Sequence, residues 1–240
     1  MGTFRTRLIG SEEVAEGTVA FRFARPAEFE FKAGQSVNLG LVDPPETDAK
    51  GNRRTFSLVS APFEPEIVCA TRMRDTAFKR VLKAMPKGQE VELRGPAGQF
   101  TLAPGEATPA VFLAGGIGIT PFVSMLRQAA KDRLARRLTL FYSNRRPEDA
   151  AFLDELSGLQ RQNANYEFVG TMTEMQKSVR TWKGETGFID RAMLERHLGD
   201  APGAIYYMAG PPAMVEAVQK MLAGAGVKDE AIRSDEFYGY

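Results

Sequence analysis

One stretch decides the fold: Ala110-Val111-Phe112-Leu113-Ala114-Gly115-Gly116-Ile117-Gly118-Ile119-Thr120-Pro121. Its five leading apolar residues predict a short buried strand. The three glycines that follow leave the backbone without side chains at the tip of that strand. Pro121 suits the first turn of a helix, where its missing N–H is not needed. The stretch therefore predicts a buried strand, a tight loop and a helix in succession, as at the opening of an α/β domain.

The rest of the C-terminal half repeats this alternation of strand and helix. Strands are predicted over Leu138–Tyr142, Tyr166–Gly170 and Ile205–Ala209, and helices over Pro121–Lys131, Asp149–Gln160, Asp190–Leu198 and Pro212–Leu222. Continuously apolar strands separated by helices indicate a parallel sheet covered on both faces. Ligands of such sheets bind at the carboxyl ends of the strands, where we expect the glycine loop. The polar stretch Met172–Thr186 shows no clear pattern.

The N-terminal half consists of short alternating stretches divided by Gly and Pro. These stretches are Thr18–Phe23, Ser36–Leu39, Thr55–Val59, Ile67–Arg72 and Glu90–Leu93. Alternation with period two at this spacing predicts an antiparallel Greek-key β-barrel, interrupted by one helix over Thr76–Met85. The connector Ala103–Pro109 has no periodicity. We therefore expect two domains, a barrel at 1–104 and a parallel α/β domain at 105–240.

Composition excludes several classes of function. The net charge of +1, from 31 Lys and Arg against 30 Asp and Glu, argues against a nucleic-acid partner. A single cysteine, Cys69, allows neither an internal disulfide nor an iron-sulfur cluster, and a single histidine, His197, argues against a metal site. The N-terminus lacks the apolar core of a signal peptide, and no apolar run approaches the ~20 residues of a membrane helix. We expect a soluble, cytoplasmic, monomeric protein.

Two short motifs carry candidate chemistry, and each has a structural alternative. The glycine loop before Pro121 offers free amides and the positive end of a helix dipole to a pyrophosphate, although its spacing differs from G-x-G-x-x-G. A glycine-rich turn between strand and helix can equally serve packing alone. The run Arg53-Arg54-Thr55-Phe56-Ser57-Leu58 combines a cation, a ring and a hydroxyl. By itself it reads as an alternating barrel strand with a solvated arginine.

The order of several motifs resembles the ferredoxin-NADP reductase-like flavoproteins. Arg54-x-Phe56-Ser57 is followed by Gly115-Gly116-x-Gly118-x-Thr120-Pro121 and then by Tyr207-Met208-Ala209-Gly210-Pro211-Pro212-Ala213-Met214. Phe31–Gln35 and Gly95–Phe100 resemble the family's entry to a barrel strand and its exit from the barrel. The resemblance covers essentially the whole chain and implies a stand-alone reductase module. In this family the barrel holds FAD, the α/β domain holds NADH or NADPH, and hydride passes between them.

The resemblance implies a set of FAD contacts on the barrel. Arg54 would pair with the pyrophosphate, Phe56 would pack on the flavin and Ser57 would hydrogen-bond near flavin N5. Thr76, Ala77 and Phe78 would offer helix amides to a phosphate. The implied FAD contacts are Arg54, Thr55, Phe56, Ser57, Thr71, Arg72, Met73, Thr76, Ala77 and Phe78. Arg72 and Arg74 can equally be solvated surface residues.

The resemblance also implies the nucleotide contacts. They are Gly115, Gly116, Gly118, Ile119, Thr120 and Pro121 in the first loop, Ser143, Asn144 and Arg145 after the second strand, and Ala209, Gly210, Pro211, Pro212 and Met214. Arg145 or Arg146 would meet the 2′-phosphate of NADPH, unless Asn144–Glu148 only caps a helix. The choice between NADPH and NADH stays open. Many relatives carry cysteine at the position of Ala209, so turnover is expected to differ.

The C-terminus resembles the family's acidic-then-aromatic ending. Asp235 would be the acid, Phe237 the ring beside the flavin, and Tyr240 part of an extension that covers the flavin or stays free. Ser57, Asp235 and Phe237 are thus the catalytic candidates. His197 is expected to be a surface residue rather than a base.

The resulting hypothesis is an FAD-dependent NAD(P)H reductase that delivers electrons singly to a soluble acceptor. The candidate acceptors are a ferredoxin, a flavodoxin, an oxygenase component, or a small quinone or ferric complex. The electron-transfer subunit of a dihydroorotate dehydrogenase is disfavoured because its cluster requires cysteines. The alternative from a different class is a non-catalytic flavin- or nucleotide-binding subunit that senses redox state or docks on a partner.

Overall fold

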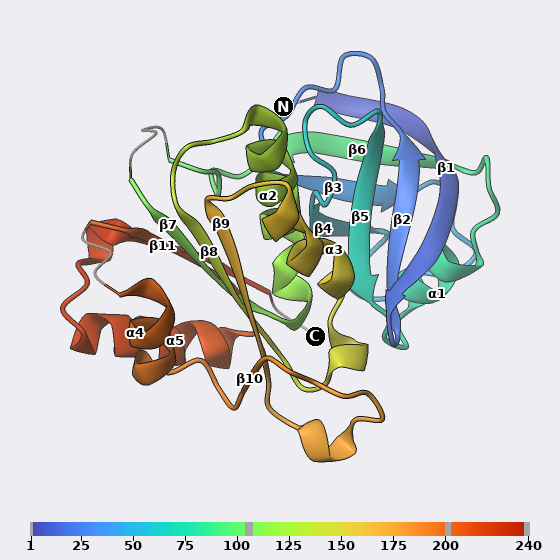
Figure 1. Ribbon diagram of the computed structural model, residues 1–240. Helices are drawn as coiled ribbons and strands as arrows, with labels where there is room; N and C mark the ends of the chain where they lie inside the picture. The colour runs from blue at the N-terminus through green and yellow to red at the C-terminus, as the bar shows by residue number, and fades with distance from the viewer. Residues whose placement is uncertain (1, 104–107, 200–202, 238–240) are drawn as a thin grey trace.

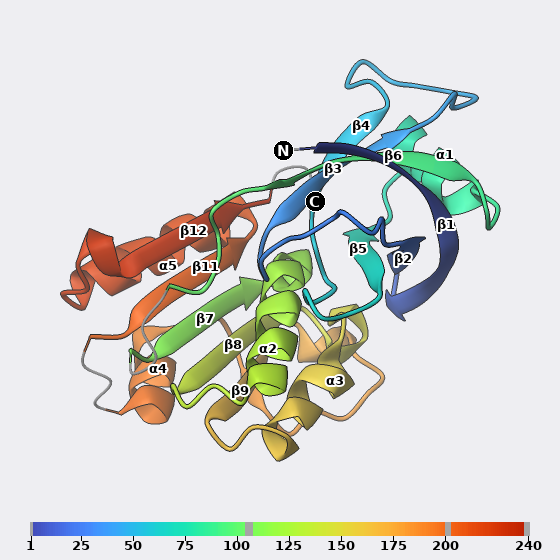
Figure 2. The same cartoon turned by 90° about the horizontal axis from the view of Figure 1, so that it is seen from above.

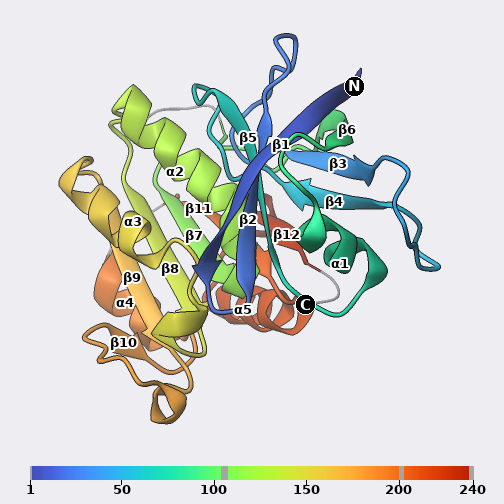
Figure 3. The ribbon, with the colours of Figure 1, turned by 90° about the vertical axis from the view of Figure 1, so that its right-hand side faces the viewer.

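The computed structural model describes residues 2–103, 108–199 and 203–237, and these form two six-stranded sheets from different parts of the chain (Figure 1). The first sheet consists of β1 (Gly2–Ala15), β2 (Thr18–Ala24), β3 (Ser36–Leu41), β4 (Arg53–Ser57), β5 (Glu66–Arg72) and β6 (Glu90–Ala97). Its strand order is β4-β3-β6-β1-β2-β5, and neighbouring strands pair antiparallel. The long strand β1 pairs first with β6 and then with β2, and it crosses the barrel diagonally (Figure 3).

The sheet closes on itself at the end of β4. Leu58 bridges Cys69 of β5, and the amide of Val59 donates to the carbonyl of Val68 at 2.8 Å. Seen from above, the strands curl around a common axis (Figure 2). Inward side chains such as Phe21, Phe23 and Leu39 fill the interior with an apolar cluster. This arrangement confirms the predicted antiparallel Greek-key barrel.

One helix interrupts the barrel, as the periodicity of residues 76–85 predicts. Helix α1 (Ala77–Ala84) begins after Thr76, whose Oγ1 accepts a hydrogen bond from the amide of Lys79 at 3.4 Å. Its Phe78 and Leu82 are buried against the barrel cluster. The helix therefore presents its first turn at the end of β5.

The second sheet is parallel and is covered on both faces. It contains β7 (Ala110–Gly115), β8 (Leu138–Asn144), β9 (Tyr166–Met172), β10 (Glu185–Thr186), β11 (Ile205–Gly210) and β12 (Ile232–Glu236) in the order β10-β9-β8-β7-β11-β12. The helices α2 (Thr120–Asp132) and α3 (Leu153–Gly158) lie on one face, and α4 (Arg191–Leu198) and α5 (Pro212–Gly224) lie on the other (Figure 1).

The alternation of side chains along β7 explains the two covered faces. Phe112 joins the apolar cluster that contains α2 and α3, whereas Val111 and Leu113 join the cluster that contains α4 and α5. All six residues of β7 are buried, as the apolar run predicts. The predicted parallel α/β fold is confirmed. The chain passes from the first sheet to the second between Ala97 and Ala110. The expected domain boundary at 104/105 lies outside the described residues.

Two predictions of secondary structure need correction. The helix expected over Asp149–Gln160 is shorter, because Phe152 takes a left-handed conformation (φ 59°) and α3 begins only at Leu153. Asp149 instead ends a 3-10 turn that starts at Pro147. The unpatterned stretch before Thr186 holds the short strand β10, and the indole of Trp182 donates to the carbonyl of Glu185 at 2.8 Å. Strand β12 is also absent from the sequence predictions.

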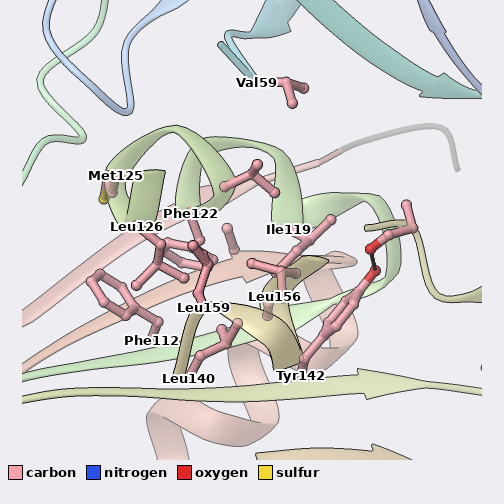
Figure 4. Packing of buried hydrophobic residues seen from close by; sticks show 14 of the residues in the cluster. Val59, Phe112, Ile119, Phe122, Met125, Leu126, Leu140, Tyr142, Leu156 and Leu159 are labelled. Atoms are coloured by element: carbon pink, nitrogen blue, oxygen red, sulfur yellow. Dashed lines mark hydrogen bonds between the residues drawn. The ribbon is translucent and has the colours of Figure 1, made fainter. Parts of the chain in front are cut away.

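Helix α2 joins the two halves of the molecule. The hydroxyl of Ser124 donates to the carbonyl of Ser60 at 2.7 Å. Arg127 forms ion pairs with Glu64 of the barrel at 3.2 Å and with Glu155 of α3 at 2.6 Å. Val59 of the barrel belongs to the same apolar cluster as the buried face of α2 (Figure 4). The barrel therefore packs directly on this helix.

None of the helices in the described part of the chain is both long enough and apolar enough to cross a membrane.

His197 lies between two carboxylates of neighbouring strands. Its Nδ1 is 3.0 Å from Glu167 of β9, and its Nε2 is 2.9 Å from Glu185 of β10. Burial alone would lower the pKa of His197, but the hydrogen bonds to both carboxylates outweigh burial and raise this pKa. His197 is partly buried, with 27% of its side chain exposed. It ties α4 to β9 and β10.

We expect His197→Gln to lower the free energy of unfolding more at about pH 6 than at about pH 9. The raised pKa means that the folded protein stabilises the protonated ring. This stabilisation is complete below the ordinary pKa of histidine and is lost as the pH rises through the raised value. Urea unfolding at both pH values measures the difference. Arg191→Gln is the control, since Arg191 pairs with Glu195 on the same helix. Equal losses at both pH values would contradict the assignment.

Candidate functional site

The glycine loop after β7 is shaped by close contact with β11. A Cβ atom on Gly118 would lie 2.3 Å from the carbonyl oxygen of Ala209, and one on Gly115 would lie 2.2 Å from Sδ of Met214. Gly116 has a φ of 53° and faces open space. The loop forms a 3-10 turn over Gly116–Ile119, and α2 follows with Pro121 in its first turn. The loop thus brings bare backbone to the carboxyl end of the sheet.

A cavity of about 350 Å³ opens at this edge, beyond the carboxyl ends of β7, β8 and β11. Strand order reverses here, because β8 and β11 lie on opposite sides of β7. The predicted residues that line the cavity are Arg72, Gly115, Gly116, Ser143, Asn144, Arg145, Pro211, Met214 and Phe237. Arg74, Ile117, Asp149, Thr173 and Phe188 line it as well. Arg72 ends β5 and Arg74 comes two residues later, so the barrel contributes to the cavity wall. The cavity therefore lies at the junction of the two sheets, which we call the seam.

The donors of the cavity suit a nucleotide. The side chain of Asn144 is buried, and its Nδ2 is one of the buried side-chain atoms without a hydrogen-bond partner among the described residues. A buried amide without a partner is costly unless a ligand or water completes it. Phe188 at the cavity wall has 79% of its surface exposed, which suits stacking on a flat base. Its sequence signal is weak, because it follows the unpatterned stretch.

Several predicted nucleotide contacts lie behind the cavity wall. Gly118, Ile119, Thr120, Pro121 and Ala209 are buried, and Pro212 begins α5. The hydroxyl of Thr120 donates to the carbonyl of Ile117 at 3.1 Å. These residues therefore shape the loop from beneath. Tyr240 lies outside the described residues.

Asp149 forms an ionic cluster at the cavity wall. Its carboxylate accepts two hydrogen bonds from Arg146, at 2.9 and 3.0 Å. Arg72 and Arg145 approach the same carboxylate at 3.6 and 3.9 Å. The hydrogen bonds from Arg146 lower the pKa of Asp149, against the effect of burial, and the charges of Arg145 and Arg72 lower it further. Arg146 itself is absent from the cavity lining and also pairs with Glu16 at 2.9 Å.

On the barrel, Arg54 is the second residue of β4. Its guanidinium hydrogen-bonds the carboxylate of Asp48 at 2.8 and 2.9 Å, and it lies 5.0 Å from the ring centroid of Phe78. Burial would raise the pKa of Asp48, but the hydrogen bonds from Arg54 and from the Lys50 amide lower it. Phe56 is buried, and its ring centroid is 6.0 Å from that of Phe78. The carbonyls of Lys50, Gly51 and Arg53 also accept from Arg54.

Lys79 adds a cation that the sequence reasoning missed. Its ammonium donates to the carbonyl of Arg72 at 2.7 Å. Burial, together with the charges of Arg74 and Arg54, lowers the pKa of Lys79 to about 8. Three cations thus gather around the first turn of α1, where helix amides also favour an anion. The available signal was a lysine in the first turn of a helix, where cations are unfavourable without an anionic partner.

The remaining FAD candidates on the barrel differ in exposure. Thr71 is fully buried, and its hydroxyl donates to the carbonyl of Arg72 at 3.4 Å. Met73 packs against the barrel cluster. Ala77 is buried at the start of α1, while Thr55 is exposed on β4. Thr55 Oγ1 accepts a hydrogen bond from the side chain of Asn38 at 3.2 Å.

Strand β12 brings the two C-terminal candidates to the seam. Asp235 pairs in register with Ala209, and the amide of Phe237 donates to the carbonyl of Gly210 at 3.0 Å. Burial raises the pKa of Asp235. Phe237 lines the nucleotide cavity, whereas Asp235 lines a second hollow together with Ser36 of β3. Ser57 is buried and pairs in register with Ser36, so both serines lie on the barrel side of this seam.

Comparison with known proteins agrees with this architecture. Residues 112–220 match the family described as oxidoreductase NAD-binding domain. The chain is 30% identical over 240 residues to the reductase component of propane 2-monooxygenase of Rhodococcus jostii (strain RHA1). That alignment covers 97% of this chain and 63% of the relative, so the chain spans less than two thirds of the relative's length.

Two crystal structures share the fold over nearly the whole length of both chains. The flavohem-like FAD/NAD-binding domain of nitric oxide dioxygenase from Vibrio cholerae has a TM-score of 0.83 at 20% identity, with 97% and 98% of the two chains covered. A ferredoxin NADP+ reductase from Neisseria gonorrhoeae, solved with FAD and NADP, has a TM-score of 0.80 at 22% identity, with 98% of each chain covered. The two sheets and the glycine loop agree with these similarities: the chain has the fold of these two structures, and its residues 112–220 match the oxidoreductase NAD-binding domain.

Proposed function

We propose that this protein is an FAD-dependent NAD(P)H reductase that passes electrons one at a time to a separate acceptor. The observation that carries the proposal is the position of the cavity at the carboxyl ends of β7, β8 and β11. It opens at the seam with the barrel, where Arg72 and Arg74 contribute to its wall. A nicotinamide nucleotide bound there would extend toward the barrel residues that are candidates for holding FAD.

Residues of the α/β domain would bind and orient the nucleotide. Backbone at Gly115–Ile117, which lines the cavity, suits its pyrophosphate. The side chain of Asn144, which lines the cavity, would donate to a ribose or phosphate oxygen, and Phe188 would stack on the adenine. Binding at both ends would fix the nicotinamide near Ala209 and Phe237.

Residues of the barrel would hold FAD. Arg54, Lys79 and the first turn of α1 suit its pyrophosphate, because they combine cations with amide donors. FAD would supply the chemistry that side chains lack, since it accepts a hydride and releases electrons singly. Ser57 would donate a hydrogen bond beside it, and Asp235, whose pKa is raised by burial, could hold a proton at its carboxyl group. Phe237 would exclude water from the reacting face.

The spectrum of the purified protein tests the proposal most directly. We expect a yellow protein whose absorbance bleaches on anaerobic addition of NADH or NADPH. Steady-state oxidation of the same nucleotide with an artificial acceptor would separate a reductase from a non-catalytic subunit that only binds flavin or nucleotide. Absence of flavin after reconstitution with FAD, or absence of bleaching with either nucleotide, would defeat the proposal.

The acceptor is proposed from chemistry and from the relatives. The relative from Rhodococcus is the reductase component of a monooxygenase, and a ferredoxin reductase of carbazole 1,9a-dioxygenase shares the fold with a TM-score of 0.80 at 23% identity. We therefore propose an oxygenase component, ferredoxin or flavodoxin as the electron acceptor. A monomeric state and a cytoplasmic location remain predictions.

Variants of Arg145 and Arg146 distinguish a contact that selects the coenzyme from a contact that only stabilises the fold. Arg145 lines the cavity and is half exposed, whereas Arg146 is held by Asp149 and Glu16. If Arg145 meets a 2′-phosphate, Arg145→Ala should weaken NADPH binding by about ten-fold or more and NADH binding much less. Arg146→Ala should instead lower thermal stability without this selectivity. Titration calorimetry measures the dissociation constants of the two nucleotides, and thermal unfolding measures the stability. Equal losses of affinity for the two nucleotides would remove Arg145 from the 2′-phosphate site.

A further inference from the structure

The ionic cluster at Asp149 joins the barrel to the wall of the nucleotide cavity. Only 4% of the Asp149 side chain is exposed. Arg72 reaches it from the end of β5, and Arg145 reaches it from the end of β8. Both arginines line the cavity together with Asp149. One buried carboxylate therefore lies between two cavity-lining cations from different halves of the molecule.

The local charge balance is positive around this carboxylate. The pKa of Arg72 is lowered, first by burial and then by the charge of Arg145, so the two guanidinium groups repel each other. The neighbouring acids are engaged elsewhere. Glu148 accepts hydrogen bonds from Ser178 and from two backbone amides, and Glu174 pairs with Lys177 at 2.8 Å. Among the described residues, Asp149 is thus the carboxylate that forms ion pairs with both Arg72 and Arg145.

The distances leave both cations able to bind a ligand. Arg146 takes the hydrogen bonds of the Asp149 carboxylate, at 2.9 and 3.0 Å. Arg72 and Arg145, at 3.6 and 3.9 Å, are attracted to the carboxylate by charge but lie beyond ordinary hydrogen-bond distance. Their N–H groups toward the cavity can therefore bind phosphate oxygens while Asp149 offsets their mutual repulsion.

We infer that Asp149 is a positioning residue of the nucleotide cavity, which holds Arg72 and Arg145 together as one clamp for the phosphates of the adenosine half. The inference rests on the proposed function. Glu16 extends the cluster into the barrel, because its carboxylate accepts from Arg146 at 2.9 Å and its amide donates to the carbonyl of Glu148 at 2.8 Å.

Calorimetric titration of the FAD-loaded full chain with NAD+, NADP+ and nicotinamide mononucleotide tests the inference. Asp149→Asn keeps the shape of the side chain and removes its charge. Without that charge Arg72 and Arg145 should separate, and the dissociation constant for NAD+ or NADP+ should rise by about ten-fold or more. Binding of the mononucleotide, which lacks the adenosine half, should stay within about two-fold. In turnover, KM should rise while kcat changes little.

Glu16→Gln is the matched control, because it removes a carboxylate of the same cluster that pairs with Arg146 rather than with Arg72 or Arg145. It should leave dinucleotide binding near that of the unmodified protein. Unchanged or tighter dinucleotide binding in Asp149→Asn overturns the inference, and so does an equal loss for the mononucleotide, which would indicate general disruption. If Asp149→Asn does not fold, Arg72→Gln must show the same selective loss. An unmodified protein that binds neither dinucleotide would instead defeat the proposed function.

Discussion

Replacing Gly118 with alanine is expected to damage both the fold and nucleotide binding. The added Cβ would lie 2.3 Å from the carbonyl oxygen of Ala209 and 2.6 Å from the amide nitrogen of Gly210. Both neighbours are backbone of β11, which cannot move aside as a flexible side chain would. Overpacking of this kind costs roughly 1–3 kcal/mol, and a chain of this length would then melt several degrees lower, about 2–4 °C per kcal/mol. Displacement of Gly210 would also distort the cavity wall at Pro211.

Gly224→Ala is the matched control for this prediction. It makes the same substitution at the end of α5, where an added Cβ would meet nothing within 4 Å. Alanine is a better helix former than glycine, so the control should be neutral or gain up to about 1 kcal/mol. Thermal unfolding and nucleotide titration should be run on both variants. A Gly118→Ala protein with unchanged melting temperature and unchanged nucleotide affinity would show that the loop tolerates a side chain.

Replacing Arg54 with alanine is expected to weaken FAD binding by ten-fold or more, because a hydrogen bond to a charged group contributes roughly 1.5–3 kcal/mol. The structure adds a second reason for a large effect. Arg54 also holds Asp48 and the carbonyls of Lys50 and Gly51, so its loss would loosen the loop between β3 and β4. Titration of apoprotein with FAD, followed by flavin fluorescence, measures the affinity.

Arg53→Ala is the control at the adjacent position. Arg53 forms its ion pair with Glu92 of β6 and lies on the alternate side of β4, away from Asp48 and Phe78. The same charge is lost, but FAD affinity should stay within about two-fold. If Arg53→Ala and Arg54→Ala weaken FAD equally, the effect is general electrostatic attraction rather than a direct contact. If neither weakens it, Arg54 is not an FAD ligand.

The spacing of apolar residues was sufficient to predict most of the fold, because this spacing reflects which side chains face the core. The run before Gly115 is buried on both faces of a central strand, and its apolar residues leave no other reading. Strand β12 carries no such signal: its residues Ile232–Glu236 are polar and half exposed at a sheet edge. Its pairing with β11 depends on tertiary contacts rather than on a local sequence pattern. The break before α3 spans the 3-10 turn that Pro147 begins and Phe152, whose left-handed conformation has no signal in the local sequence.

The candidate site divides in the same way. The cavity-lining residues Gly115, Gly116 and Pro211 were predictable, because glycine and proline occur where the local backbone must come close to a ligand or a neighbouring strand. The side chains that complete the cavity from distant segments were not. Asp149 and Phe188 are brought to the wall only by the folded chain, and the Lys79 ammonium reaches the Arg72 carbonyl across a turn. The spacing of residues along the sequence does not predict such long-range contacts.

Because Val59, Ala20 and Ala70 of the barrel share one apolar cluster with α2, the two halves cannot part without exposing that surface to water. Under the proposed function, the separation between the FAD site of the barrel and the glycine loop would therefore be set once, when the chain folds. The pace of the cycle would then depend on how quickly the dinucleotide enters and leaves past the rim at Phe188 and Phe237, and on the encounter with the acceptor.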